Sequence, residues 1–134
     1  MAAEPVWLDK PLMLGLYDDV VVASGGAAGL RDEGLLESAL ARPINRRAYE
    51  GVDGLLELAA TYAVGIASNH PFVDGNERMA FIALGQFLEE NGIVLPAGAD
   101  DATEIMLSVA TGKTDIAALA AWLQSRTLRI GRAP

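Results

Sequence analysis

Apolar side chains recur at intervals of three and four residues along most of this chain, and glycines and prolines separate the stretches that show this spacing. The period is typical of helices with one buried face, whereas a half-buried strand alternates at every second residue. The pattern therefore predicts an all-α fold, a compact bundle of helices. The expected helices span about residues 9–24, 32–43, 53–69, 76–91, 100–110 and 116–123.

Capping residues and helix breakers set the expected ends of these helices. Asp9, Asp32 and either Asp100 or Asp101 precede apolar stretches, and their carboxylates can accept hydrogen bonds from first-turn N–H groups, as N-caps do. Pro43 is expected to end the second helix, because proline and the residue before it are both poorly suited to a helix interior.

The third expected helix, 53–69, carries the longest uninterrupted helical pattern and should be the central helix of the fold. It should end near Asn69, because His70 precedes Pro71 and a residue before proline is disfavoured in the α conformation. The next helical pattern begins near Asn76. Two buried helices are thus expected to flank one short polar loop.

The composition narrows the classes of function. The 134 residues include no cysteine, which excludes disulfides, thiolate metal sites and a catalytic cysteine, and the length predicts a single domain over residues 1–134. A net charge of −8 makes nucleic acid a poor partner, because proteins that bind it usually carry a basic surface. No apolar run is long enough to cross a membrane, and the first ten residues do not resemble a secretion signal. A cytoplasmic protein that binds neither nucleic acid nor membrane is expected.

Basic residues are concentrated at two places in this acidic chain. Arg42, Arg46 and Arg47 follow the second expected helix, and we expect their side chains to be solvated. The tail, residues 125–134, is also basic, and we expect it to be frayed because chain ends without apolar anchors seldom pack.

The chemically useful side chains gather in residues 70–78 (HPFVDGNER), which we call the motif loop. His70 is the only histidine of the chain, and an imidazole can accept a proton from an attacking hydroxyl near neutral pH. Asp74 offers the hard oxygen ligand that Mg²⁺ prefers. Asn76 and Arg78 can donate hydrogen bonds to phosphate oxygens. These side chains are sufficient for phosphoryl transfer, which depends mainly on positioning and charge neutralisation.

Gly75 permits backbone geometry that other residues avoid, so the following helix can begin abruptly and present unpaired N–H groups to an anion. Such a site can hold a phosphate despite the negative net charge. A purely structural interpretation also stands, because a histidine at a helix end and an Asp-Gly-Asn sequence are ordinary capping and turn residues. The spacing alone leaves both interpretations open.

The motif loop resembles the signature of the Fic/Doc superfamily, H-x-F-x-[DE]-[GA]-N-x-R, and matches it at every fixed position. Within that superfamily, the chain is similar to the Doc group of toxins across most of its length. The supporting segments are residues 25–26, 29–32, 48–50, 60–62, 87–88, 91–92, 109–110 and 112. The resemblance implies a Fic/Doc-type helical bundle with the motif loop between its two central helices.

The resemblance also implies an activity. A Doc-type toxin is a protein kinase that transfers the γ-phosphate of ATP to a threonine of translation elongation factor Tu and so inhibits translation. The implied site residues are His70 and Arg78 as catalytic residues, Asp74 as the Mg²⁺ ligand, and Gly75, Asn76, Glu77 and Arg78 as nucleotide-binding residues. Fic-type relatives transfer AMP instead, so AMP transfer is an alternative, and a catalytically inert relative that only binds antitoxin is another.

Glu77 departs from the Doc pattern, in which a lysine precedes the final arginine. A carboxylate aimed at the phosphates would repel them. Two unit charges ~4 Å apart interact by about 4 kcal/mol at an effective dielectric of 20, which is enough to lower the rate of transfer by roughly a hundredfold or more. A glutamate in a first helical turn gains only about 0.3–1 kcal/mol from the helix dipole. We therefore expect Glu77 to weaken activity unless its side chain points outward. A natural variant with altered chemistry, an inert relative and a detoxified form all fit this residue.

Control is expected to come from another chain. Many Fic enzymes carry an inhibitory helix with the pattern [ST]-x-x-x-E-[GN], and the segment nearest to it, Gln86–Asn91, has glutamine at the hydroxyl position. The resemblance implies an antitoxin of the Phd type, whose C-terminal region folds as a helix in an apolar groove of the toxin. The apolar residues of the last helices could line such a groove, or they could simply complete the core of the monomer.

Overall fold

The computed structural model describes residues 3–25, 29–96 and 98–129, and it confirms the all-α fold. Its elements in chain order are α1 (Lys10–Tyr17), a π-helix η1 (Asp18–Val22), α2 (Glu33–Glu50), α3 (Leu55–Asn69), α4 (Asn76–Glu90), β1 (Ile93–Val94), α5 (Ala99–Ala110), α6 (Ile116–Gln124) and β2 (Leu128–Arg129). Within these described ranges, no helix is long and apolar enough to span a membrane.

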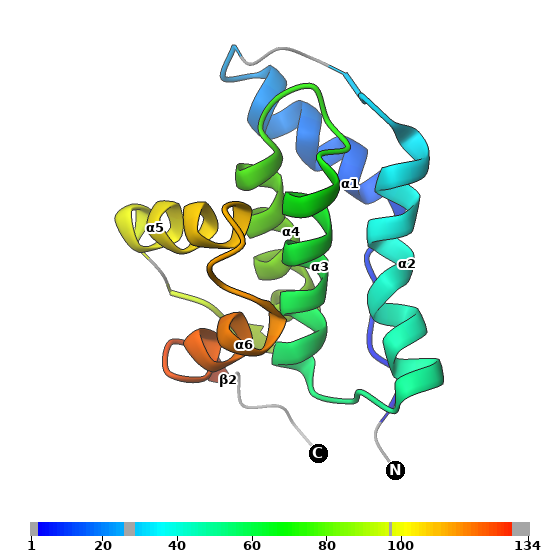
Figure 1. The fold of residues 1–134 in the computed structure, drawn as a ribbon, viewed down its shortest axis with the longest axis vertical. Helices are drawn as coiled ribbons and strands as arrows, with labels where there is room; N and C mark the ends of the chain where they lie inside the picture. Colours follow the sequence, from blue (N-terminus) through cyan, green and yellow to red (C-terminus); the bar gives the residue numbers. More distant parts are fainter. Residues whose placement is uncertain (1–2, 26–28, 97, 130–134) are drawn as a thin grey trace.

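Helix α3 lies at the centre of the molecule, as the sequence predicts (Figure 1). Nine of its fifteen residues are buried, because α3 packs against α2, α4 and α6. Figure 1 shows α2 on one side of the α3–α4 pair and α5 and α6 on the other. The loop that joins α3 to α4 therefore lies at one end of the bundle, away from the β1–β2 pair at the opposite end.

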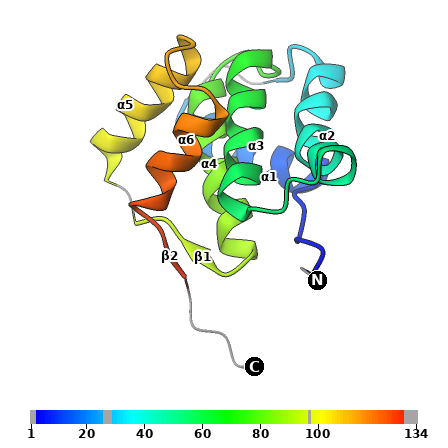
Figure 2. The same ribbon diagram turned by 60° about the horizontal axis from the view of Figure 1, so that its bottom comes forward.

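The two short strands form an antiparallel pair that the sequence did not predict (Figure 2). Ile93 pairs with Arg129 and Val94 with Leu128, and two residues are too few to show an alternating pattern. The prediction of a frayed tail is wrong for residues 125–129. The N–H group of Thr127 donates to the carbonyl of Leu123, and β2 follows directly. The rest of that tail, residues 130–134, lies outside the described residues.

The first helical segment begins where the sequence predicts and continues past α1 as a π-helix. The carboxylate of Asp9 accepts a hydrogen bond from the N–H group of Leu12 at 2.9 Å. In η1, the N–H group of Ala23 donates to the carbonyl of Asp18 at 3.2 Å, five residues back, so this turn is one residue wider than an α-turn. Gly25, with φ of 88°, follows the segment, and Gly26 lies outside the described residues.

Helix α2 does not end at Pro43, and this prediction is wrong. The helix continues for seven more residues to Glu50 and is terminated by Gly51, whose φ of 70° is left-handed. A proline inside a helix costs about 3 kcal/mol because one hydrogen bond is lost and the ring crowds the preceding turn. Burial of Pro43 and contacts made by the residues after it offset that cost.

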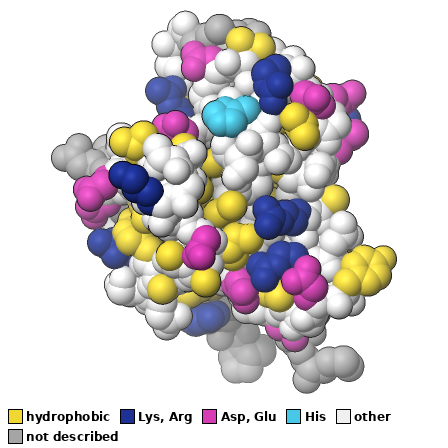
Figure 3. Space-filling view, viewed as in Figure 1, with side chains coloured by type: hydrophobic (Ala, Val, Ile, Leu, Met, Phe, Trp, Pro, Cys, Tyr) yellow, Lys and Arg dark blue, Asp and Glu magenta, His cyan; other side chains and the backbone are white. Residues whose placement is uncertain are grey.

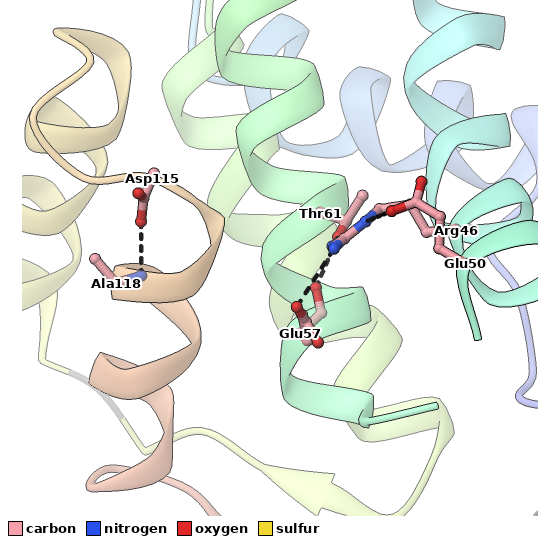
Figure 4. A network of polar contacts seen from close by, with 6 residues as sticks. All are labelled: Arg46, Glu50, Glu57, Thr61, Asp115 and Ala118. Carbon is pink, nitrogen blue, oxygen red and sulfur yellow. Dashed lines mark hydrogen bonds and ion pairs between the residues drawn. The ribbon is translucent and has the colours of Figure 1, made fainter. Parts of the chain in front are cut away.

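The strongest of these contacts come from Arg46, which reaches from α2 to α3 (Figure 4). Its guanidinium donates to the hydroxyl of Thr61 at 2.8 Å, pairs with Glu57 at 3.3 Å and lies 3.6 Å from Glu50. Only 18% of the Arg46 side chain is exposed, so the prediction that this arginine is solvated is wrong.

Arg47 is also engaged, because it pairs with Glu4 and with Asp53. Only Arg42, which is exposed, behaves as expected of the three arginines. The prediction that Arg46 and Arg47 are solvated is based on their local sequence alone. Their carboxylate partners come from other segments of the fold as well as from α2 itself.

The remaining helix ends match the predictions in part. Asp32 caps α2 by accepting from the N–H group of Leu35 at 2.9 Å. The N-cap of α5 is Gly98 instead of Asp100 or Asp101, and α3 begins after Gly54.

The N-terminal segment is fastened to the core by two side chains from distant elements. The amide of Asn91 accepts from the N–H group of Val6 at 2.8 Å and donates to the carbonyl of the same residue at 3.0 Å. The N–H group of Leu8 donates to the hydroxyl of Tyr62 at 3.1 Å, and burial raises the pKa of Tyr62 to about 12. Residues near the start of the chain are thus bound to the middle of α3 and to the C-cap of α4.

We expect Arg46→Met to lower the free energy of unfolding by about 1–3 kcal/mol, because it keeps most of the apolar stem but leaves Glu57 without its cation. Urea denaturation measures the change. Arg42→Met is the matched control, since Arg42 lies on the same helix with its side chain exposed, and it should change stability by less than about 0.5 kcal/mol. Equal effects of the two variants would contradict a bridging role for Arg46.

Candidate active site

The connection between α3 and α4 begins and ends at residues with left-handed backbone conformations. His70 ends α3 with φ of 50° and ψ of 56°, and among the described residues it is the only non-glycine residue with positive φ. Gly75 is the N-cap of α4 with φ of 78°. The chain therefore leaves one central helix and enters the next within a few residues, at the positions that the sequence predicts.

Phe72 anchors the middle of the loop in the core. Its ring is buried and stacks on Tyr17, with centroids 4.2 Å apart and planes inclined by 8°. The backbone of Phe72 forms a bridge with Leu30, and the N–H group of Val73 donates to the carbonyl of Gly29 at 3.0 Å. The loop is thus held from both sides, by α1 through the ring and by residues 29–30 through the backbone.

The buried side chain of Asn76 joins the start of α4 to the backbone of Phe72. Its amide oxygen accepts from the N–H group of Phe72 at 2.9 Å, and its amide nitrogen donates to the carbonyl of the same residue at 2.9 Å. The residue is only 9% exposed. Sequence reasoning gave Asn76 a contact with phosphate, and it missed this positioning role because Phe72 becomes a partner only once the loop is folded.

Gly75 is required by close packing as well as by its backbone angles. A Cβ atom at this position would lie 2.7 Å from Cγ2 of Val21, which belongs to the π-helix η1. No side chain fits in that space unless Val21 moves. The close approach brings η1 directly against the start of α4, where the N–H groups of the first turn have no carbonyl partner within the helix.

Asp74 precedes this helix start, and Arg78 lies in the first turn of α4. One carboxylate oxygen of Asp74 accepts from the N–H group of Gly75 at 2.8 Å, and the residue is exposed. The guanidinium of Arg78 donates to the hydroxyl of Ser24 at 3.0 Å, and that hydroxyl donates to the carbonyl of Val21 at 3.1 Å. Ser24 is a contact that the sequence motif alone did not indicate.

The described residues contain no group of three or more histidine, cysteine or acidic residues that could hold a metal by themselves. A single carboxylate is nevertheless the kind of ligand set that suits Mg²⁺ when water and phosphate oxygens supply the other ligands. Asp74 fits that case, because it is exposed and only one of its oxygens is used by the N–H group of Gly75.

All six residues predicted for the site line one cavity of about 720 Å³: His70, Asp74, Gly75, Asn76, Glu77 and Arg78. Its remaining walls are mainly apolar and come from Val73, Phe81, Ile82, Ala102, Thr103 and Met106. Figure 3 shows the single histidine side chain, in cyan, at the surface with a basic side chain beside it. Sequence reasoning missed the contribution of α5, because only the folded chain brings residues 102–106 opposite the motif loop.

We expect Gly75→Ala to destabilise the protein by about 1–3 kcal/mol, because alanine is strained at this φ and its Cβ overlaps Val21. Thermal or urea unfolding measures the effect, and Val21→Ala in the same chain should restore the part that is due to overlap. Gly85→Ala on α4 is the control, since its Cβ meets open space, and it should stabilise the helix by about 0.5–1 kcal/mol. A Gly75→Ala variant as stable as the parent would contradict this packing.

Comparison with known proteins identifies relatives of the chain. Residues 7–88 match the Fic/DOC family. The chain is 41% identical over 107 residues to the toxin Doc of Mycolicibacterium smegmatis, an alignment that covers 76% of this chain and 81% of that toxin. It is 32% identical over 108 residues to the protein kinase doc of Escherichia phage P1, which covers 81% of this chain and 85% of that kinase. The motif, the fold and these relatives agree, and the chain belongs to the Fic/Doc family.

Proposed function

We propose that this protein is a Doc-type toxin that acts in the cytoplasm as a protein kinase, transferring the γ-phosphate of ATP to a threonine of translation elongation factor Tu. The observation that carries the proposal is the shared cavity, in which an imidazole, a guanidinium, a carboxylate and a helix N-terminus face the same space. The names of the two relatives, a toxin and a protein kinase, support the same class of activity.

The site can bind the phosphates of a nucleotide through the start of α4. The N–H groups of the first turn and the positive end of the helix dipole attract an anion, and Gly75 has no side chain that would block its approach. The guanidinium of Arg78 adds a charged donor, and it would exchange its hydrogen bond with Ser24 for one with a phosphate oxygen.

In this proposal, His70 is the base that acts on the hydroxyl that attacks the phosphate. The residue is exposed at the edge of the cavity, so a protein substrate can reach it, and one ring nitrogen can accept the proton that the threonine hydroxyl loses. Asp74 would hold Mg²⁺, which when bound neutralises charge on the phosphate oxygens. The apolar walls from α4 and α5 would exclude water from the reacting groups.

Glu77 places a second carboxylate at the same cavity, and we propose that it weakens transfer. Its side chain is exposed and lines the cavity. A negative charge near the transferring phosphate raises the barrier, because charge repulsion is only partly screened at the edge of a protein site. The Doc pattern has a cation at this position, so the local charge differs by two units.

A second chain is proposed to restrain the toxin. The relative from Mycolicibacterium smegmatis is named as a toxin, and toxins of this kind are paired with antitoxins. We propose a Phd-like antitoxin whose C-terminal segment folds as a helix on an apolar surface of this chain.

Intact-mass spectrometry of elongation factor Tu tests the proposed activity. The factor is incubated with this protein, ATP and Mg²⁺, and a gain of one phosphoryl group on a threonine is expected. His70→Ala should abolish the gain while preserving the fold, because its side chain is exposed. A gain of AMP would instead identify an AMP transferase, and no modification by the parent or by Glu77→Lys would favour an inert protein that only binds antitoxin.

Glu77→Lys should raise the rate of phosphate transfer by about tenfold or more, because it replaces a repulsive charge with an attractive one. Transfer from γ-labelled ATP measures the rate. Glu89→Lys is the matched control, since Glu89 is exposed on the same helix but does not line the cavity, and the rate should stay near that of the parent. An equal rise in both variants would show that only the net charge of the protein matters.

A further inference from the structure

Three consecutive carbonyl groups at the end of α3 accept hydrogen bonds from one short segment, residues 31–32. The Nε atom of Arg31 donates to the carbonyl of His70 at 2.6 Å, and Nη2 donates to the carbonyl of Asn69 at 2.8 Å. The backbone N–H groups of Arg31 and Asp32 both donate to the carbonyl of Pro71, at 2.7 Å and 3.0 Å. The last residue of α3 and the first two residues of the motif loop are therefore held by the side chain of Arg31 and by the backbone of Arg31 and Asp32.

These hydrogen bonds surround His70, the one non-glycine residue of the site with a left-handed backbone. A non-glycine residue in the left-handed region persists only where surrounding contacts hold it there. For His70 the N–H group donates to Ile66 at 3.1 Å, as in any helix end, whereas the carbonyl is bound by Arg31. Pro71 has no N–H group to donate. The backbone after His70 is therefore held by hydrogen bonds that the carbonyls of His70 and Pro71 accept.

We infer that Arg31 is a positioning residue for His70: its two hydrogen bonds hold the left-handed backbone of His70 and thereby direct the imidazole into the cavity. The backbone angles of a residue fix the direction of its Cα–Cβ bond. A return of His70 to the right-handed or extended region would turn the side chain away from its present direction. The inference rests on the proposed function for its effect on transfer, but its structural part does not.

The chemistry of the contact suits arginine in particular. A guanidinium is planar and presents its N–H groups as a fixed fork, so it can bind two adjacent carbonyls at once, whereas lysine offers a point charge on a flexible stem. A cation at the C-terminus of a helix is also favoured by the helix dipole. Among the described residues, Arg31 forms no ion pair, so its side chain is committed to these carbonyls.

Selective labelling of histidine with ¹³C and ¹⁵N tests the positioning directly, because the chain has a single histidine and its NMR signals need no assignment. In the full chain, the HN–Hα coupling and the Cα shift of His70 report φ, and the ring signals report the surroundings of the imidazole. We expect Arg31→Met to shift both sets of signals. Arg42→Met, which removes an exposed arginine from α2, should leave them unchanged.

The same variants are assayed for transfer of phosphate. Arg31→Met should lower kcat by roughly ten- to a hundredfold with little change in KM for ATP, because a base out of position impairs the chemical step more than nucleotide binding. Arg31→Lys should recover part of both the NMR signals and kcat, since lysine can reach one of the two carbonyls. Should Arg31→Met fail to fold, Arg31→Lys carries the test alone.

The outcomes separate the two proposals. Unchanged His70 signals in the folded Arg31 variants would overturn the positioning role, whatever happens to the rate. If Arg31→Met shifts the His70 signals as expected but neither the parent nor Glu77→Lys transfers phosphate, the proposed kinase activity is overturned and the positioning role stays intact.

Discussion

Two hydrogen bonds between the amide of Asn76 and the backbone of Phe72 hold the α3–α4 connection in its compact form. Because both bonds are buried, breaking them would leave polar groups without partners in a medium that solvates them poorly. The Phe72 ring is then kept in the core against Tyr17, and the chain must turn into α4 at Gly75. The polar groups of the candidate site lie along this short path and in the first turn of α4.

Electrostatics explains how so acidic a protein can present a site for phosphate. The net charge of −8 is spread over the molecule, but the cavity is lined by Arg78 and by the start of a helix of fifteen residues. Charges at contact distance in a partly enclosed site outweigh charges that lie beyond the screening length in solution. Glu77 matters for the same reason, since it is one of the few carboxylates close enough to act on a bound anion.

Much of this arrangement could be predicted from the sequence, because the signals are local. The helical period of α3 and α4, the caps at Asp9 and Asp32 and the pre-proline position of His70 each depend on residues a few places apart. The confirmed helices and the position of the motif loop follow from such short-range rules.

The main errors have a different origin, because they concern contacts between segments that are distant in the sequence. Helix α2 continues through Pro43 since Arg46 finds partners on α3, and no rule of local sequence contains those partners. The paired residues of the two short strands are 36 and 34 positions apart in the chain, and the cavity wall from α5 and the hydrogen bonds of Arg31 also appear only after folding. The pattern of apolar and polar residues along the sequence does not contain such long-range polar contacts.

The π-helix η1 sets the direction in which Val21 and Ser24 point at this end of the bundle. One surplus residue in a helical turn rotates the next side chains by roughly 100° about the axis. With that surplus, Val21 faces Gly75 and Ser24 reaches Arg78. Without it, the side chains at these positions would be rotated away from their present partners on α4. The additional residue therefore acts as a spacer. For these contacts, the number of residues between Tyr17 and Ser24 matters as much as their identity.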